Sequence, residues 1–206
     1  MKNKTYDVAN SKNISFYQRL KSYLYLKYHG VVFDSNTYVK KNFELRKSKD
    51  SLIQLGKNCV IQEYVFFLLT EPNPKLTIGN NVSIGRSSII AIKDHLQIGD
   101  NTEIAANVFI CDQSHGIEIG KLITNQKSQI EKVVIGEDVW IGTGSVILKG
   151  VKIGNGSIVG ANSLVSEDTK PWKIYIGNPA KEIAIRKKEN IIKYSVELGY
   201  KIDIKD

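Results

Sequence analysis

A period of six residues limits the folds open to this chain more than any other feature. An isoleucine or valine returns at this spacing, and in many repeats a glycine follows it. The aliphatic positions are Ile78, Ile84, Ile90, Ile98, Ile104, Ile110, Ile135, Ile141, Ile147, Ile153, Val159 and Val165. A unit of six residues is too short for a helical repeat, but it suits one short strand and one corner.

The six-residue unit predicts a parallel solenoid built from triangular coils. Each aliphatic side chain points inward, where β-branched residues pack well, and glycine or asparagine takes the bend. Three units close a coil, and stacked coils pair their backbones. We therefore expect an all-β fold, with a β-helix in residues 51–180, an N-terminal helix and capping segment in residues 1–50, and a C-terminal helix in residues 181–206. The period fixes neither the hand nor a function, so a scaffold without chemistry stays an alternative.

Both ends of the chain show helical patterns. Residues 14–29 form an amphipathic pattern that stops at Gly30. We expect this helix to cover the open edge of the solenoid, although its basic, tyrosine-rich face also suits a peripheral membrane contact. Residues 181–198 predict a second helix that packs on the solenoid or on a neighbouring subunit. Between residues 31 and 57 the period is poor, which suggests irregular early coils.

The repeat is interrupted by two extra residues within residues 93–96 and by a long polar loop at about residues 116–133. A loop of that length in a compact repeat is more often functional than accidental. His115 stands directly before it, and an imidazole can accept a proton at neutral pH as a general base. Asp112 is close enough in sequence to orient or polarise this ring. A lone histidine at a loop edge is, however, more often a plain surface residue.

Composition argues against several classes of protein. The net charge of +8 favours an anionic partner, but no aromatic-basic motif points to nucleic acid. Two cysteines are too few for a disulfide framework, and the three histidines lack zinc-site spacing, so we expect no metal. The polar start and the lack of an apolar stretch of about 20 residues argue against export and membrane insertion. We expect a cytoplasmic protein, with the inner face of the membrane as the alternative location.

Three motifs occur in an order typical of one family. They are Asp-x-x-His-Gly at residues 112–116, Val-Trp-Ile-Gly at residues 139–142 and Gly-Asn-Pro-Ala-Lys at residues 177–181. Over roughly residues 55–186 the chain resembles the hexapeptide-repeat acetyltransferases, most closely the bacterial O-antigen, colanic acid and capsule polysaccharide O-acetyltransferases. The resemblance implies a left-handed β-helix, acetyl-CoA as the acetyl donor, a sugar or glycan acceptor, and a homotrimer with its sites between subunits.

The resemblance also implies a role for each matching residue. His115 would be the general base that takes a proton from a sugar hydroxyl, and the acceptor side would include Asp112, Asn107 and Trp140. The coenzyme A side would comprise Gly142, Thr143, Gly160, Ala161, Ser166, Lys181 and Arg186. In that set, Thr143 and Ala161 would offer backbone groups to the pantetheine arm, and Lys181 and Arg186 would neutralise phosphates. Trp140 could equally be a corner aromatic, and both cations could be solvated charges.

Other activities remain open at the level of sequence. The acceptor could be an amino sugar nucleotide, which would make the protein an N-acetyltransferase, or a drug. Acceptor choice would lie in the loop after His115, so neither the sugar nor the acetylated group can be identified. A thiol nucleophile at Cys111 is not favoured, because Cys111 occupies a repeat position and no second histidine is near it in sequence.

Overall fold

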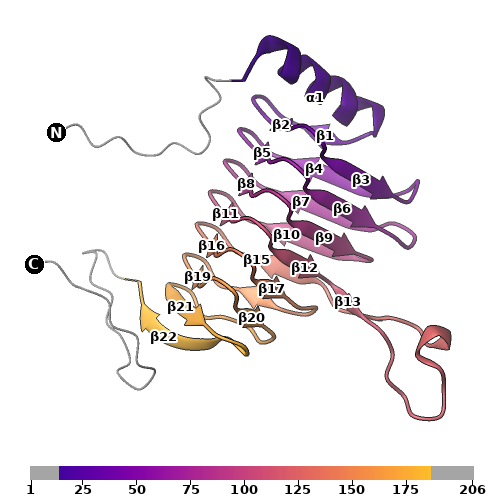
Figure 1. Ribbon diagram of the computed structural model, residues 1–206, viewed down its shortest axis with the longest axis vertical. Helices are drawn as coiled ribbons and strands as arrows, with labels where there is room; N and C mark the ends of the chain where they lie inside the picture. The colour runs from indigo at the N-terminus through magenta and orange to yellow at the C-terminus, as the bar shows by residue number, and fades with distance from the viewer. Residues whose placement is uncertain (1–13, 187–206) are drawn as a thin grey trace, which may run out of the picture.

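The computed structural model describes residues 14–186, which form one helix and a left-handed parallel β-helix (Figure 1). The helix is α1 (Phe16–Tyr28), and three parallel sheets form the sides of the coils. The first sheet contains β1 (Val32–Phe33), β4 (Leu52–Leu55), β7 (Lys75–Ile78), β10 (His95–Ile98), β15 (Val133–Ile135) and β18 (Lys152–Ile153). This architecture confirms the fold class expected from the period.

The other two sheets follow the same stacking order. The second sheet contains β2 (Tyr38–Val39), β5 (Val60–Ile61), β8 (Ser83–Ile84), β11 (Glu103–Ile104), β16 (Trp140–Ile141), β19 (Ile158–Val159), β21 (Lys173–Ile176) and β22 (Lys181–Ile185). The third sheet contains β3 (Glu44–Lys47), β6 (Phe66–Leu69), β9 (Ile89–Ile92), β12 (Phe109–Cys111), β17 (Val146–Ile147) and β20 (Leu164–Val165). We call the bend between the first and second sheets the first corner, the next bend the second corner, and the bend that leads to the following coil the third corner.

The aliphatic residues of the period fill the inside of the coils. Ile78, Ile98, Ile135 and Ile153 lie in register on successive strands of the first sheet, and all four are buried. Equivalent columns run up the second and third sheets, so one continuous apolar core extends along the axis. Removing this apolar surface from water is the main favourable term in the stability of the fold.

The β-helix begins earlier than the predicted boundary at residue 51. Phe33, Val39 and Leu45 are six residues apart and stand in register with Leu55, Ile61 and Phe67 of the next coil. The prediction of irregular coils between residues 31 and 57 was therefore wrong. Phenylalanine and leucine replace the usual isoleucine or valine there, and extra residues between coils conceal the period.

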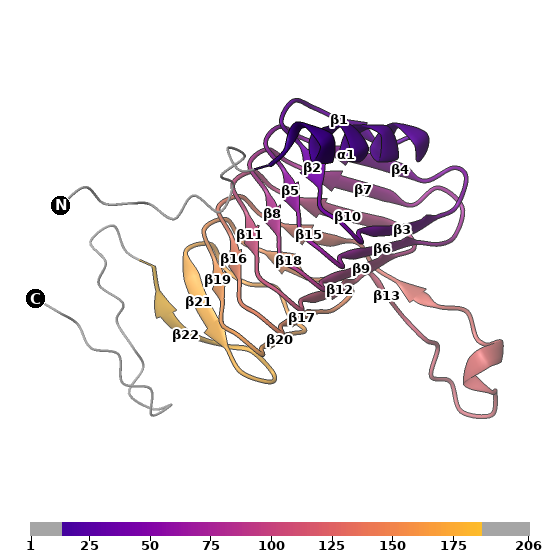
Figure 2. The same ribbon diagram turned by 45° about the horizontal axis from the view of Figure 1, so that its top comes forward.

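All extra residues of the repeat leave the coils at the third corner. The inward positions flanking them are Leu45 and Leu55, Phe67 and Ile78, Ile90 and Ile98, and Ile110 and Ile135. The last of these insertions is the long loop, which contains β13 (Gln113–Ser114), a short 3₁₀ helix η2 (Ile123–Asn125) and β14 (Gln129–Ile130). It projects from the body of the molecule in both views (Figures 1 and 2).

Asparagines with positive φ make the first corner of the early coils. Asn36, Asn58, Asn81 and Asn101 have φ between 57° and 58°, a region that asparagine tolerates better than most residues. The side-chain amides also form a ladder along the axis. Asn36 Nδ2 donates to Asn58 Oδ1 (3.3 Å), Asn58 Nδ2 to Asn81 Oδ1 (2.9 Å), and Asn81 Nδ2 to Asn101 Oδ1 (2.9 Å). The corner is thus held by backbone geometry and by side-chain bonds.

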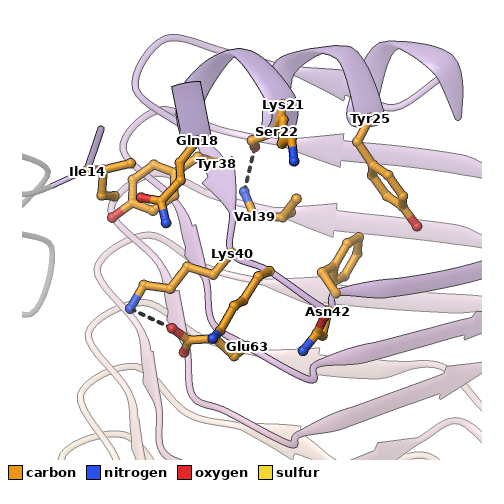
Figure 3. A pocket seen from close by; sticks show the side chains of 12 residues that line it. Ile14, Gln18, Lys21, Ser22, Tyr25, Tyr38, Val39, Lys40, Asn42 and Glu63 are labelled. Carbon is orange, nitrogen blue, oxygen red and sulfur yellow. Dashed lines mark hydrogen bonds and ion pairs between the residues drawn. The ribbon is translucent and has the colours of Figure 1, made fainter. Parts of the chain in front are cut away.

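The predicted N-terminal helix is confirmed and lies across the first coil (Figure 1). The Oγ of Ser15 accepts a hydrogen bond from the Gln18 N–H (3.2 Å), which caps the first turn. Leu26 is buried against the core, and the Ser22 Oγ accepts the Val39 N–H (2.7 Å) on the open side of β2 (Figure 3). The helix therefore covers an otherwise unpaired strand edge. Within residues 14–186, no helix is both long and apolar enough to cross a membrane.

The C-terminal prediction needs a correction. The helix expected from residue 181 is a strand as far as Ile185: β22 pairs antiparallel with β21. Ile183 and Ala184 are buried against Ile174, and the pairing satisfies the exposed edge of the second sheet, so local helix propensity loses to tertiary contacts. The rest of the predicted helix lies outside the described residues.

Candidate active site

His115 lies at the base of the long loop and is accessible to solvent. The loop leaves the third corner as an antiparallel ribbon in which Gln113 pairs with Ile130 and Ser114 with Gln129. His115 follows directly, with an exposed side chain. The ring has no hydrogen bond or ion pair with any other residue in the described range of 14–186. Its nitrogens are thus open to a substrate.

The carboxylate of Asp112 holds the third corner. Asp112 is completely buried, at 0% exposure. Its Oδ1 accepts the Lys93 N–H (2.8 Å), and its Oδ2 accepts the N–H groups of Asp94 (2.7 Å) and His95 (3.0 Å). All three hydrogen bonds serve the coil, and the place of Asp112 beside an acceptor, which the resemblance implies, stays a prediction. Asp112 fixes the point at which the loop begins.

The loop is braced by its own polar groups. The Gln126 Oε1 accepts the Glu118 N–H (2.8 Å), and the Gln126 Nε2 donates to the carbonyls of Glu118 (3.1 Å) and Lys121 (3.0 Å). A Cβ at Gly116 would come within 2.8 Å of the Gln126 Cβ, so the two arms meet only because residue 116 is glycine. Lys149 forms an ion pair with Glu131 at the end of the loop. His115 is thus carried on an ordered arm.

Trp140 lies on a different side of the coils, on β16 of the second sheet. Its side chain is 53% exposed and lines a hollow of about 180 Å³ together with Arg86, Glu103 and Ala106. Of the predicted acceptor residues, Asn107 is an exposed corner residue with φ of 59°, and its N–H donates to the Arg86 carbonyl (2.9 Å). Its backbone conformation accounts for the asparagine.

Thr143 and Ala161 occupy equivalent positions in consecutive coils at the second corner. The pairing of β16 with β19 places residues eighteen apart in register, as the sequence predicts. Both residues are exposed, and within the described part of the chain neither backbone N–H donates a hydrogen bond. The Thr143 Oγ1 is occupied, since it donates to the Ala106 carbonyl (2.7 Å). The two N–H groups remain available for a ligand.

Gly142 and Gly160 are required by coil stacking. A Cβ at Gly142 would lie 2.6 Å from the Ala161 nitrogen, and a Cβ at Gly160 would lie 2.6 Å from the Ile176 Cγ1. The close approach expected at these glycines is therefore made by the next coil, and no ligand is needed to explain it.

The structure separates the three residues expected near the nucleotide end. Ser166 follows β20 and lies at the third corner, and Lys181 begins β22 next to Ile176 at the second corner. Arg186 lies at the first corner, where its guanidinium bonds to Asp138 and stacks over Trp172. Only Lys181 shares a corner with Thr143 and Ala161, so these three residues form the coherent part of the expected donor side.

A single chain does not bring His115 to this donor side. The loop leaves the third corner, whereas Trp140 and Thr143 lie on the second sheet and at the second corner. Figure 2 shows the loop extending away from the second sheet.

Among the described residues, no group of histidine, cysteine or acidic side chains could hold a metal ion. Burial raises the pKa of the Cys111 thiol, which disfavours the thiolate.

Sequence reasoning missed the residues that hold the loop. Lys93 and Ser128 contact one another at its base, and Gln126 closes its interior. The signal available in the sequence was the two-residue insertion around Lys93, which marks a second irregularity at the same corner as the loop. Lys93 and Ser128 are far apart in the sequence, and they come together only because both insertions leave the coils at the same corner.

Two family models match the repeats. One, described as bacterial transferase hexapeptide (six repeats), matches residues 132–167, and the other, described as hexapeptide repeat of succinyl-transferase, matches residues 75–112. Galactoside O-acetyltransferase of Escherichia coli (strain K12) is 31% identical over 161 residues, which are 74% of each chain. Chloramphenicol acetyltransferase of Escherichia coli is 43% identical over 67 residues, 32% of each chain.

Among solved structures, the β-helix resembles that of AntD, an N-acyltransferase from Bacillus cereus, in complex with dTDP and 3-hydroxybutyryl-CoA. The TM-score is 0.71 at 24% sequence identity, over 86% of this chain and 93% of that one. This likeness supports the fold.

Proposed function

Because the chain belongs to the family of hexapeptide-repeat acetyltransferases, we propose that it transfers an acetyl group from acetyl-CoA to a sugar hydroxyl. The acceptor we propose is a surface-polysaccharide sugar or its precursor. The similarity to galactoside O-acetyltransferase supports a hydroxyl of a sugar, and the acyl-CoA bound to AntD supports a coenzyme A thioester as donor.

The observation that carries the proposal is the exposed His115 on an ordered loop at the third corner. As general base, His115 takes the proton of the acceptor hydroxyl while the oxygen attacks the thioester carbonyl. The tetrahedral intermediate then collapses with loss of the coenzyme A thiolate, and the imidazolium returns the proton to the sulfur. Backbone N–H groups stabilise the oxyanion of the intermediate.

The second corner supports the donor side of this proposal. The backbone N–H groups of Thr143 and Ala161 donate no hydrogen bond within residues 14–186, so they suit the amide carbonyls of a pantetheine arm. Lys181 is an exposed cation at the same corner and suits a phosphate of coenzyme A.

The separation of His115 from the second corner supports a trimer in which one subunit supplies the base and its neighbour the donor wall. The loop also presents five exposed aliphatic side chains, a surface that a second copy would cover. These are Ile117, Ile119, Leu122, Ile123 and Ile130. Light scattering should give three times the mass of one chain, and a monomeric mass for an active enzyme would contradict the proposal.

Mixing two inactive variants tests the shared site more directly. His115→Ala removes the base, and Ala161→Trp blocks the donor wall. If both are refolded together, random assembly leaves about a quarter of the interfaces with both native residues, so about a quarter of the activity should return. A site within one chain would gain nothing from mixing.

The proposed reaction is tested with acetyl-CoA and a panel of sugars and glycans, with release of the coenzyme A thiol as the signal. His115→Ala should lower turnover at least about a hundredfold, as expected for loss of a general base. His29→Ala is the matched control, since His29 ends α1 far from the loop. Retained turnover in His115→Ala would place the base elsewhere.

A second candidate is N-acylation of an amino sugar nucleotide, which is favoured by the likeness to AntD, solved as a mutant with dTDP-4-amino-4,6-dideoxyglucose and coenzyme A. The same panel therefore includes amino sugar nucleotides and chloramphenicol. Preference for an amine would replace the hydroxyl as acceptor while leaving the donor and the general base unchanged.

We place the protein in the cytoplasm, where acetyl-CoA is made, with α1 able to contact the inner face of the membrane. Phe16, Leu24 and Tyr28 are exposed on α1 and support such a contact. Cell fractionation tests the location, and recovery outside the cell would contradict it.

A further inference from the structure

We infer that Lys93 is a positioning residue for His115, an inference that rests on the proposed function. The Nζ of Lys93 donates to the Ser128 Oγ (2.9 Å) and lies 2.9 Å from the Glu71 Oε1. Its side chain is only 19% exposed. Lys93 thus joins the long loop to the insertion of another coil at the third corner.

The register of the ribbon connects this contact to His115. Ser114 pairs with Gln129 in an antiparallel arrangement, so the next residues on the two arms, His115 and Ser128, stand opposite one another. The Lys93 ammonium is therefore bonded to the residue across from the proposed base. Loss of the Lys93 side chain would therefore free Ser128, the residue that stands opposite His115 in the ribbon.

The backbone of Lys93 holds the other arm of the same ribbon. Its N–H donates to the buried carboxylate of Asp112, from which the outgoing arm begins. Its side chain holds Ser128 on the returning arm. One residue therefore fixes both arms at the base of the loop, and the loop can carry His115 to a neighbouring subunit at a defined angle.

The chemistry of lysine suits this role. Its ammonium has three donors on a flexible stem, so it reaches a carboxylate and a hydroxyl in different directions. The carboxylate of Glu71 keeps the charge compensated while Ser128 receives a charge-assisted bond. Methionine, of similar length, would leave both partners without the bond.

Loss of this anchor should lower turnover and spare donor binding. A misplacement of a reacting group by about 1 Å can cost on the order of a hundredfold in rate, so Lys93→Met should lower kcat about 10- to 100-fold. The KM for acetyl-CoA should stay within about twofold, because the donor wall lies at the second corner. Lys93→Arg should recover part of kcat, and Ser128→Ala should show a smaller loss than Lys93→Met.

Lys40→Met is the matched control. Lys40 also pairs with one carboxylate, Glu63 (3.5 Å; Figure 3). It lies at the second corner of the first coil and lines a pocket with residues of α1, whereas the loop leaves the third corner of a later coil. Its removal should leave kcat unchanged. An equal loss of kcat in both variants would show a general effect of removing a lysine and would overturn the inference.

Hydrogen exchange on the wild type and on Lys93→Met tests the anchor without any acceptor. Amides in residues 113–115 and 127–130 should exchange at least about tenfold faster in the variant, and those of residues 133–147 should be unchanged. Unchanged exchange in the loop would overturn the inference, as would faster exchange throughout the coils. If the wild type acetylates no acceptor while the loop loosens as expected, the anchor stands and the proposed function fails.

Discussion

Arg186 and Asp138 form an ion pair at the first corner, with the Arg186 Nη1 2.8 Å from the Asp138 Oδ2. The same nitrogen donates to the carbonyls of Asp138 (3.2 Å) and Gly156 (3.3 Å). The guanidinium joins the end of β22 to two earlier coils. These contacts give Arg186 a structural use, whereas its predicted contact with a phosphate of coenzyme A stays untested.

Arg186→Ala should therefore leave the KM for acetyl-CoA unchanged. Both side chains are more than one third exposed, so the pair contributes at most about 1 kcal/mol to the free energy of unfolding. Lys181→Ala is the matched comparison: removing a single phosphate contact should raise that KM about 3- to 10-fold. Initial rates at varied acetyl-CoA distinguish the two, and a raised KM in Arg186→Ala alone would contradict the structural role.

Asp112→Asn should destabilise the fold. Its carboxylate accepts three backbone N–H groups in a buried site, and hydrogen bonds to a charged group are worth about 1.5–3 kcal/mol each. Because an amide still accepts on one oxygen, we expect a loss of about 2 kcal/mol in the free energy of unfolding. Urea denaturation at fixed protein concentration measures it.

Asp168→Asn is the control for that experiment. Asp168 is exposed, and its Oδ1 accepts the Lys152 N–H (2.7 Å). Its loss should be below about 1 kcal/mol. Equal stability losses at Asp112 and Asp168 would show that burial of the carboxylate does not matter.

Cys111→Ser should retain activity. Cys111 is buried, and burial raises the pKa of its thiol, so the group is poorly suited to act as a nucleophile. We expect turnover within about threefold of the wild type, with slow reaction of the native thiol toward a disulfide reagent. An inactive but folded Cys111→Ser variant would point to covalent catalysis.

The coils from Ile78 onward could be predicted because every sixth side chain points into the coil, where a branched apolar residue such as isoleucine or valine fits. Phe33 and Phe67 hold the same inward positions, and aromatic contacts accommodate their rings: Phe33 lies 5.6 Å from the ring of Tyr23 on α1, and Phe67 lies 5.1 Å from that of Phe43. Aromatic substitutions and insertions between coils remove the local signal. The start of the β-helix was therefore recognised only from the pairing of strands.

The site was predictable in parts. The sequence alone places His115 directly before the long loop, and the eighteen-residue spacing of Thr143 and Ala161 corresponds to one coil; the roles of these residues in catalysis stay predictions. The structural use of Asp112 could not be foreseen, because its three donors come from an insertion on the preceding coil. The sequence alone does not tell at which corner of the coil an insertion projects, so it could not show that these donors lie next to Asp112.

The hydrogen bonds of the asparagine ladder all run in the same direction along the axis of the β-helix. Every Nδ2 donates toward the C-terminal coils, from Asn36 to Asn101, so the side-chain dipoles align head to tail and polarise one another. At the following coil Asp138 takes the same left-handed corner position, with φ of 54°. One edge of the protein therefore carries aligned amide dipoles over its first four coils, and in the next coil a carboxylate held by the guanidinium of Arg186 occupies the same place.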